Sequence, residues 1–451
     1  MTILKARRAH MPVATLSLPE RPRPVTRLLA GAREDRPAEL SEHVRDYGPL
    51  PLPAAAWTGD EAAARRAAER LIQEVELSGL TGRGGAGFPT ARKLRSVAAG
   101  KGQAVVVANG SEGEPASSKD RLLLTRVPHL VLDGISLAAF ATGAVEAFLV
   151  VHRDEQLIAS LEAAVRARQV AGVDPVPVQI VGIEDRYVAS EQTAIVQHLN
   201  GGPGLPMFAP PRTHERGVAG GPTAVNNVET LAHLALIARH GHAWFRAAGQ
   251  PAAPGTALVT VSGAIARPGI YEIELGTPIG DILARAGGPT ERPQAVLVGG
   301  YFGTWLPAEQ AWGLPMSQPG LRSAGASMGA GVLIVLPESS CGLAETARVT
   351  RYLAGESAGQ CGPCVFGLPA LADALSELAH QGGRGDAVHR IAGLIPLIEG
   401  RGACRHPDGA TQLAASALTA FRDHAYWHDK QRPCPSANQR PLLPVPSGGE
   451  Q

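Results

Sequence analysis

The sequence has almost no net charge, no long hydrophobic run and no continuous apolar segment at its N-terminus. Its 42 basic and 41 acidic residues leave a formal charge of +1, which gives no reason to expect nucleic acid or a membrane surface as a partner. No apolar stretch approaches the roughly 20 residues that span a bilayer, so we expect no direct membrane insertion. Residues 1–24 contain basic residues but no apolar core, so we expect no secretory signal.

Cysteine is also scarce, with five residues scattered over 451 positions. This distribution does not resemble an extracellular disulfide framework and favours a metal or redox site in a reducing compartment. We therefore expect a cytoplasmic protein, or one that reaches the membrane only through partner subunits. The length is sufficient for two to four domains, each with its own core.

The hydrophobic pattern predicts an α/β multidomain protein. A helical period begins after Asp60 and ends at Gly79, and expected strands near residues 104–108, 147–151 and 176–180 alternate with apolar helices. Such alternation is typical of a parallel sheet. We assign residues 51–250 to this domain and residues 1–50, rich in arginine and proline, to an N-terminal extension that wraps the surface.

The second half of the chain has a different pattern. Residues 255–336 contain a strand, a turn, a second strand, a short helix and returning strands, which indicates a small β-grasp domain. We expect Thr277 to be the N-cap of that helix, with Pro278 in its first turn. Residues 337–430 show only helical signals, and residues 431–451 form a Pro-rich tail.

Three of the five cysteines lie in two short segments of the helical part. Cys361 and Cys364 are three residues apart, and Cys404 follows forty residues later. Two thiolates at this spacing plus a third from a distant loop are how proteins collect ligands for iron–sulfur or zinc. The Cys-Gly-Pro-Cys segment also matches the thioredoxin dithiol, but that motif follows a strand, whereas the segments flanking this one are helical. Cys341 and Cys434 are either inert buried thiols or extra ligands, if the fold brings them near.

Residues 82–87, GRGGAG, form a glycine-rich loop. A helix precedes this loop, so it is not the ordinary dinucleotide fingerprint, which follows a strand. A flexible surface loop is the alternative. Its backbone N–H groups could instead cradle a phosphate whose charge Arg83 and Lys93 neutralise. Asn109, at the carboxyl end of an expected strand, could reach the edge of a ring.

Four segments resemble the NADH-oxidising 51-kDa or F subunit of respiratory complex I, which has relatives in hydrogenases and formate dehydrogenases. Residues 79–90, GLTGRGGAGFPT, resemble the flavin loop of that family. The segments at 109–121, 187–194 and 221–230 resemble its NADEGEP…KDR, YICGEETA and PTTVNNVET motifs. The similarity keeps the same order from about residue 79 to 410.

The resemblance implies three domains: a Rossmann-like flavodehydrogenase domain, a β-grasp domain of the SLBB type and a helical bundle with a [4Fe–4S] cluster. The residues it assigns to FMN and NAD(H) are Gly82, Arg83, Gly84, Gly85, Gly87, Lys93, Asn109, Glu112, Glu114, Tyr187, Glu191, Asn226 and Asn227, with Glu114 on the nicotinamide side. Cys361, Cys364 and Cys404 match cluster ligands.

The chain departs from the family pattern at several positions. Ala358 stands where the family has its first cysteine ligand, so a substitute ligand, a [3Fe–4S] cluster or no cluster are all open. Ser111 and Gln192 replace acidic residues, which makes the flavin pocket less negative and should raise the flavin potential. Arg212 replaces an aromatic residue, which leaves the choice between NADH and NADPH open.

These features predict an FMN-dependent NADH dehydrogenase, an NADH:acceptor oxidoreductase that serves as an electron-input subunit. Hydride would pass to FMN, and single electrons would leave through the cluster to an iron–sulfur partner protein or a quinone-linked chain. No residue is expected to act as a covalent or acid–base catalyst. A cluster-less flavin diaphorase and a non-catalytic assembly subunit are the alternatives.

Overall fold

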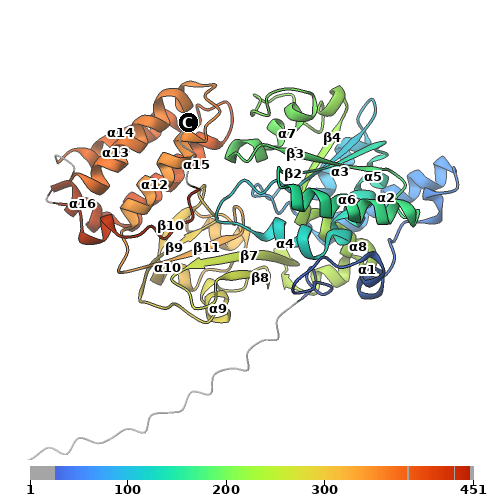
Figure 1. Cartoon of the computed structure of the whole chain (residues 1–451), viewed down its shortest axis with the longest axis horizontal. Helices are drawn as coiled ribbons and strands as arrows, with labels where there is room; N and C mark the ends of the chain where they lie inside the picture. The colour runs from blue at the N-terminus through green and yellow to red at the C-terminus, as the bar shows by residue number, and fades with distance from the viewer. Residues whose placement is uncertain (1–25, 383–384, 431, 447–451) are drawn as a thin grey trace, which may run out of the picture.

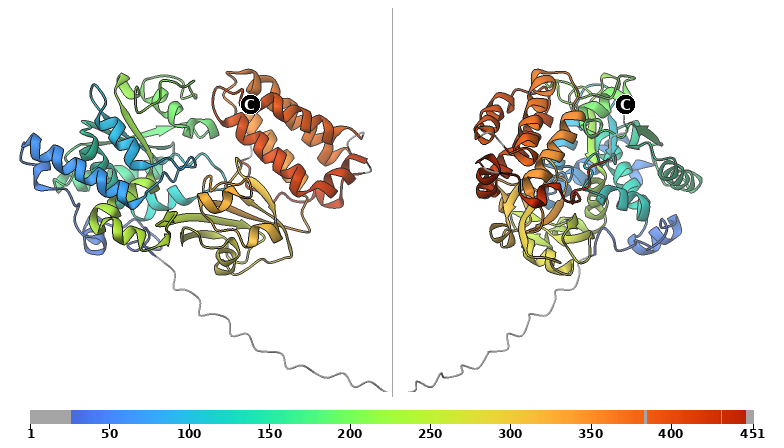
Figure 2. Two further views of the ribbon diagram at one scale, coloured as in Figure 1. Left: turned by 180° about the vertical axis from the view of Figure 1, so that it is seen from behind. Right: turned by 60° about the vertical axis from the view of Figure 1, so that its left-hand side comes forward.

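A computed structural model describes residues 26–382, 385–430 and 432–446 (Figure 1). The N-terminal α/β domain and the C-terminal helical bundle lie at opposite ends of the molecule, with the second sheet below and between them. The two rotated views show the same arrangement (Figure 2). The predicted α/β multidomain class is confirmed.

The first domain is built on a parallel four-stranded sheet in the order β3-β2-β1-β4. These strands are β1 (Val105–Asn109), β2 (Glu146–His152), β3 (Val178–Ile183) and β4 (Thr223–Asn227). Successive residues of β1 face opposite cores: Val106 and Ala108 pack in the larger one, and Val105 and Val107 in the smaller one. The carboxyl ends of β1 and β4 are therefore neighbours, because Asn109 pairs with Asn227.

Helices cover both sides of this sheet. They are α2 (Glu61–Ser78), α3 (Thr90–Ala98), α4 (Lys119–Arg126), α5 (Pro128–Thr142), α6 (Glu155–Val170), α7 (Gln192–Leu199) and α8 (Val228–Arg246), with short turns η1 (Ala54–Ala56), η2 (Tyr187–Ser190) and η3 (Val218–Gly220). Asp60 caps α2 by accepting from the Ala63 amide, and Gly79 ends the helix, as predicted, with φ of 72°. The α5 and α8 backbones meet at Gly134, where an added Cβ would lie 2.0 Å from the Leu231 carbonyl oxygen.

Residues 26–50 do more than wrap the surface. They contain an unpredicted helix, α1 (Leu40–Tyr47), and bury Leu28 and Tyr47 in the core of the first domain. The backbone amides of Arg27 and Leu28 donate to the carboxylate of Glu272 at 2.9 and 3.0 Å. This part of the predicted extension is therefore part of the folded core, and residues 1–25 lie outside the described residues.

The second domain is a five-stranded sheet in the order β10-β9-β11-β7-β8, with β7 and β11 parallel and the other pairs antiparallel. Its elements are β7 (Thr256–Gly263), β8 (Gly269–Glu274), α9 (Ile279–Arg285), β9 (Pro293–Val298), β10 (Thr304–Pro307), α10 (Ala308–Trp312), α11 (Gln318–Arg322) and β11 (Val332–Pro337). The linker before it forms a small hairpin of β5 (Gly249–Gln250) and β6 (Ala253–Pro254). The prediction that Thr277 is the N-cap of α9 was wrong. Pro278 takes that position, and the Thr277 hydroxyl donates to the Glu274 carbonyl.

The helical bundle packs on one face of this second sheet. Val296 and Val335 point toward α9, whereas Leu297 and Ile334 point into the core shared with the bundle. The bundle consists of α12 (Gly342–Gly355), a π-helical turn η4 (Pro363–Gly367), α13 (Leu368–His380), α14 (Ala387–Ile398), α15 (His406–Ala420) and α16 (Arg422–Lys430).

The described part of the Pro-rich tail, residues 432–446, is packed against this bundle. It contains a short turn, η5 (Pro435–Asn438), and buries Cys434 and Leu443. The amide of Leu442 donates to Glu345 at 2.6 Å, and the hydroxyl of Tyr301 donates to the Pro444 carbonyl at 2.5 Å. The tail thus contacts both the bundle and the β-grasp domain.

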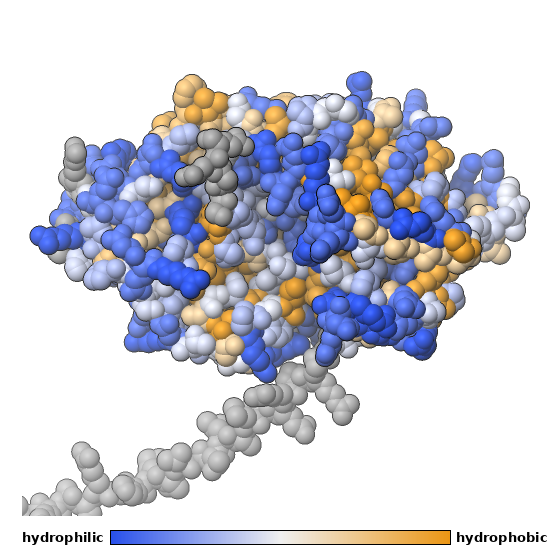
Figure 3. All heavy atoms as spheres, viewed as in Figure 1, coloured by the Kyte–Doolittle hydropathy of each residue, from blue (hydrophilic) through white to orange (hydrophobic). Residues whose placement is uncertain are grey.

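No single helix within the described ranges is long and apolar enough to cross a bilayer; α4 and α5 meet the criteria only as a pair, across a 97° bend. The face seen in Figure 1 carries broad hydrophilic areas broken by smaller hydrophobic patches (Figure 3).

Candidate functional site

The glycine-rich loop lies against the carboxyl ends of β1 and β4. It connects α2 to α3, and an added Cβ at Gly84 would lie 3.2 Å from Cβ of Asn227. The amide of Arg83 donates to the Thr230 hydroxyl at 2.9 Å, which fixes the loop to the start of α8. A small cleft of about 30 Å³ opens here, lined by Thr81, Gly82, Arg83, Gly85, Gly87, Lys119, Glu229, Ala257, Leu258, Gln318, Met328, Gly329 and Gly331.

Three asparagines mark the strand ends beside this loop. Asn226 is buried, and its Nδ2 has no partner among the described residues. Asn109 donates to the Ser190 carbonyl at 2.9 Å. Asn227 caps α8 through the Glu229 amide and donates to Asp120 at 2.6 Å. An unpaired buried amide is costly, so Asn226 fits a role in binding a polar ligand.

Lys93 and Arg83 differ in what they offer to an anion. Lys93 is partly buried and donates to the Val225 carbonyl at 2.6 Å, and burial lowers its pKa to about 8. Arg83 donates instead to the Thr256 and Thr81 carbonyls and lies 4.0 Å from Glu229. The Arg83 guanidinium therefore connects the loop to β7 while it lines the cleft, and its role toward a phosphate stays a prediction.

A group of three buried charges beside the cleft was not predicted from the sequence. The Lys119 ammonium lies 2.7 Å from Asp120 and 3.0 Å from Glu229, and all three side chains are buried. Although burial acts in the opposite direction, Lys119 lowers the pKa of Glu229 to about 2. The available signal was that these charges stand inside segments 109–121 and 221–230, which carry the family resemblance.

Two of the predicted acidic ligands have helix-capping roles in the structure. Glu112 accepts from the Ser117 hydroxyl at 2.6 Å and from the amides of Asp120 and Arg121 at the start of α4. Glu191 accepts from the Thr193 amide at 2.8 Å at the start of α7. Each carboxylate satisfies backbone donors that would otherwise lack a partner.

Glu114 is held by three donors from different parts of the fold. Its carboxylate accepts from the Tyr301 amide at 2.7 Å, the Ala116 amide at 3.2 Å and the Tyr187 hydroxyl at 3.2 Å. Burial raises its pKa to about 7, against the effect of these hydrogen bonds. Glu114 therefore stands at the junction of the first domain and the β-grasp domain.

Tyr187 also contacts residues of the β-grasp domain and of the helical bundle. Its ring centroid lies 4.8 Å from that of Phe302 and 5.6 Å from that of His406. Its amide donates to Glu356 at 2.7 Å, two residues before Ala358. His406 opens α15 two residues after Cys404. A packed aromatic contact thus connects Glu114 with the region of the cysteines.

Cys361, Cys364 and Cys404 come together at one end of the bundle. The Cys361 and Cys364 sulfurs are 3.6 Å apart, and Cys404 lies close enough to both for the charge on one thiolate to oppose ionisation of the next. Burial opposes ionisation of the Cys361 thiol, but the amides of Ala403 and Cys364 hold its pKa below the usual value. Burial raises the pKa of Cys364 to about 11. Three sulfur donors in this arrangement fit an iron–sulfur cluster, with a methyl group in place of a fourth thiolate at Ala358.

Cys341 and Cys434 lie together, with their sulfurs within 4.8 Å of each other, and neither can complete this set. Cys341 is the N-cap residue of α12, whereas Cys361 follows the other end of that helix. Fourteen helical residues separate two such ends by about 20 Å. The helical surroundings of Cys361 and Cys364 also exclude the thioredoxin arrangement, in which the dithiol follows a strand.

Three residues where the chain departs from the family pattern lie in different environments. Ser111 is buried, and its hydroxyl donates to Asn109 at 2.7 Å. Gln192 is exposed at the first position of α7, and Arg212 is exposed with its amide bonded to Glu215 at 2.9 Å.

Comparison with known proteins connects these features. Residues 75–236 match the Nuo51 FMN-binding domain, residues 258–300 the SLBB domain, and residues 344–428 the NADH-ubiquinone oxidoreductase-F iron-sulfur binding region. The second F subunit of the NADH-quinone oxidoreductase of Rhizobium meliloti is 32% identical over 383 residues, which cover 81% of this chain and 90% of the relative. The chain belongs to the family of NADH-quinone oxidoreductase F subunits.

A second relative and a solved structure are similar to this chain over most of its length. The corresponding F subunit of Streptomyces coelicolor is 32% identical over 84% of this chain and 87% of its own length. A chain of an NAD+-reducing [NiFe]-hydrogenase in the H2-reduced state superposes with a TM-score of 0.74 at 32% identity, covering 85% of this chain and 66% of the hydrogenase chain. The predicted family is confirmed, as are the SLBB domain and the FMN and iron–sulfur cofactor classes.

Proposed function

We propose that this F-family protein is an NADH dehydrogenase subunit that takes electrons from NADH and delivers them singly to a partner. FMN, when bound, supplies the hydride acceptor and the one-electron donor. The observation that carries the proposal is the packed contact from Glu114 through Tyr187 to His406, which joins the predicted nicotinamide side to the cysteine end of the bundle.

The residues at the strand ends are proposed to hold the cofactor. The backbone of residues 82–87 and the Lys93 ammonium would face its phosphate, and the unpaired Asn226 amide would bind its ring edge. The cleft must widen to admit a whole flavin, since it measures only about 30 Å³ in this structure. Lys119 and Glu229 line this cleft as an ion pair, and Asp120 pairs with Lys119 behind them.

The three thiols at the end of the bundle are proposed to hold the iron–sulfur cluster. Cys361 is the thiol best prepared to ionise, because two amides point at its sulfur. With Ala358 in the fourth position, one iron site must take a ligand other than a cysteine of this segment.

The surface beside the cysteines is suited to a protein partner. Val365 and Phe366 follow Cys364 directly and are 48% and 75% exposed. Exposed large apolar side chains next to a redox centre fit an interface with an iron–sulfur acceptor protein.

Anaerobic purification with absorbance and EPR spectra, before and after NADH, tests the proposal. The expected result is a flavin that NADH bleaches, together with iron whose EPR signal appears on reduction. Flavin without iron would support a diaphorase in its place, and the absence of both would support an assembly role.

A further inference from the structure

We propose a second metal site in the helical bundle, formed by Cys341, His428 and Cys434, for a zinc-like divalent ion. This site is separate from the cysteines assigned to the iron–sulfur cluster. Its donor atoms, two sulfurs and one imidazole nitrogen, all lie within 4.8 Å of one another, and all three residues are buried. Among the described residues, no other group of three histidine, cysteine or acidic side chains has its ligand atoms this close together.

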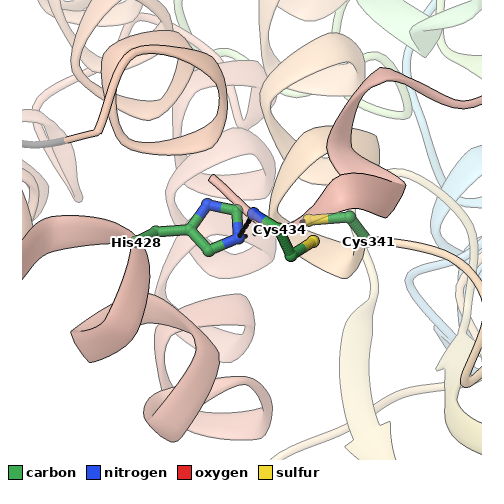
Figure 4. A group of neighbouring side chains, drawn as sticks. All are labelled: Cys341, His428 and Cys434. Carbon is green, nitrogen blue, oxygen red and sulfur yellow. Dashed lines mark hydrogen bonds between the residues drawn. The ribbon is translucent and has the colours of Figure 1, made fainter. Parts of the chain in front are cut away.

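The three ligands come from segments that are distant in the sequence. Cys341 precedes α12, His428 lies in the last turn of α16, and Cys434 is the N-cap residue of η5 in the tail. Figure 4 shows the imidazole of His428 directed toward the two cysteines. An ion at this point would tie the tail to both helices.

The histidine is already in the tautomer that metal binding requires. Its Nδ1 lies 3.1 Å from the Leu378 carbonyl oxygen, which can only accept, so Nδ1 carries the proton. Nε2 therefore presents its lone pair toward the cysteines, where it accepts from the Cys434 amide at 3.0 Å. A histidine ligand held by a backbone carbonyl through its second nitrogen is the usual arrangement in metal sites. Metal binding would replace the hydrogen bond from Cys434.

The spacing of the donors is close to that of a tetrahedral site. Bonds of about 2.3 Å to sulfur and 2.0–2.1 Å to nitrogen place donor atoms roughly 3.5–3.8 Å apart. The Cys341 sulfur lies 4.0 Å from Nε2 of His428, so only a small contraction is needed. Burial raises the pKa of the Cys341 thiol, and the amides of Leu343 and Ala344, which point at its sulfur, act in the opposite direction.

The ligand types select the ion. Two thiolates and an imidazole suit zinc, which needs no redox change and prefers four ligands. Binding would release the two thiol protons to solvent. A cavity of about 350 Å³ whose wall includes Cys341 and His380 adjoins the site, so water could supply the fourth ligand.

Metal analysis of the reduced, full-length chain tests the site, with zinc and cobalt as probes. We expect about one zinc per chain and, after exchange, a thiolate-to-cobalt charge-transfer band. Cys434→Ser and His428→Gln should each lower zinc affinity at least about 10-fold. Cys361→Ser should lower iron and leave zinc unchanged, and His389→Gln, an exposed histidine on α14, should change neither.

The wild-type cobalt titration needs no variant, so it stands even if a substitution prevents folding. Absence of the charge-transfer band in the reduced wild type would overturn the proposal. So would a Cys341–Cys434 disulfide in the intact mass of protein purified without reductant. Equal zinc loss in Cys361→Ser and Cys434→Ser would place the ion at the cluster thiols and reject this site.

Discussion

The hydroxyl of Tyr187 donates to Glu114 across 3.2 Å, and this bond joins two segments that are 73 positions apart in the sequence. Glu114 follows β1, and Tyr187 begins the turn that follows β3. The Tyr187 ring also packs on His406, so Glu114 and Tyr187 lie where the first domain contacts the bundle.

Removing this hydroxyl should shift the ionisation of Glu114. The bond to Tyr187 favours the charged carboxylate, so Tyr187→Phe should raise the pKa of Glu114 above its value of about 7. The limb of the pH profile for NADH oxidation that reports Glu114 should move to higher pH, measured with an artificial acceptor. Tyr271→Phe, whose hydroxyl bonds only to Arg267, is the control. An unchanged or lower pH for this limb would show that the bond does not set the titration.

Glu114 should also make stability depend on pH. Its pKa is about 7 in the folded protein against an ordinary value of 4.5, so between these values the folded state keeps a proton that the unfolded state has lost. Stability should therefore fall as pH rises through this window, by up to about 3 kcal/mol. Glu114→Gln cannot titrate and should lose less stability than wild type between about pH 5 and about pH 8 in urea unfolding. The exposed Glu69→Gln should follow the wild type; identical pH slopes in Glu114→Gln and wild type would contradict the assignment.

The buried lysine of the cleft should be essential for stability. Lys119→Met leaves Asp120 and Glu229 buried without their cation, which should cost about 3–5 kcal/mol in the free energy of unfolding. Arg95→Met breaks the exposed pair with Glu76 and should cost at most about 1 kcal/mol. If Lys119→Met and Arg95→Met lose equal free energy of unfolding in denaturant titrations, the buried side chains are not held together as ions.

A side chain in the glycine loop should prevent flavin binding. A Cβ at Gly84 already meets Asn227 at 3.2 Å, so Gly84→Val should crowd the loop where its backbone must approach a phosphate. We expect a large loss of bound flavin, measured by absorbance after denaturation. Gly393→Ala, where an added Cβ meets nothing within 4 Å, should keep full flavin content. Unchanged flavin in Gly84→Val would remove the loop from the site.

Restoring the missing cysteine should complete the cluster. Ala358→Cys places a thiolate in the same segment as Cys361 and should increase iron content and give a four-iron EPR signal on strong reduction. Ser357→Cys, one position earlier, is the control and should not have this effect. If the wild type binds no iron anaerobically and Ala358→Cys does not change that, the bundle holds no cluster.

The local elements were largely predictable because hydrophobic period and capping act over short distances. The limits of α2 follow from Asp60 and Gly79, and the strands near Val106 and Leu149 follow from short apolar runs. Thr277 was misassigned because the Glu274 carbonyl, one turn back, takes its hydroxyl. Helix α1 was missed because its few apolar residues show no period without the core that they contact.

The family, the order of domains and the cysteine set with Ala358 in place of a ligand could be predicted from the sequence, because they depend on residue identity and spacing. The direction in which each side chain points depends on the packed fold. This fold turned Arg83 into the protein interior, used Glu112 and Glu191 as helix caps, and separated Cys341 from Cys361 by the length of α12. It also brought Cys341, His428 and Cys434 together. The contact between Arg83 and Thr256 joins positions 173 residues apart, and Cys341 and Cys434 are 93 apart. No local pattern encodes such contacts, because they arise only when distant segments pack around a common core.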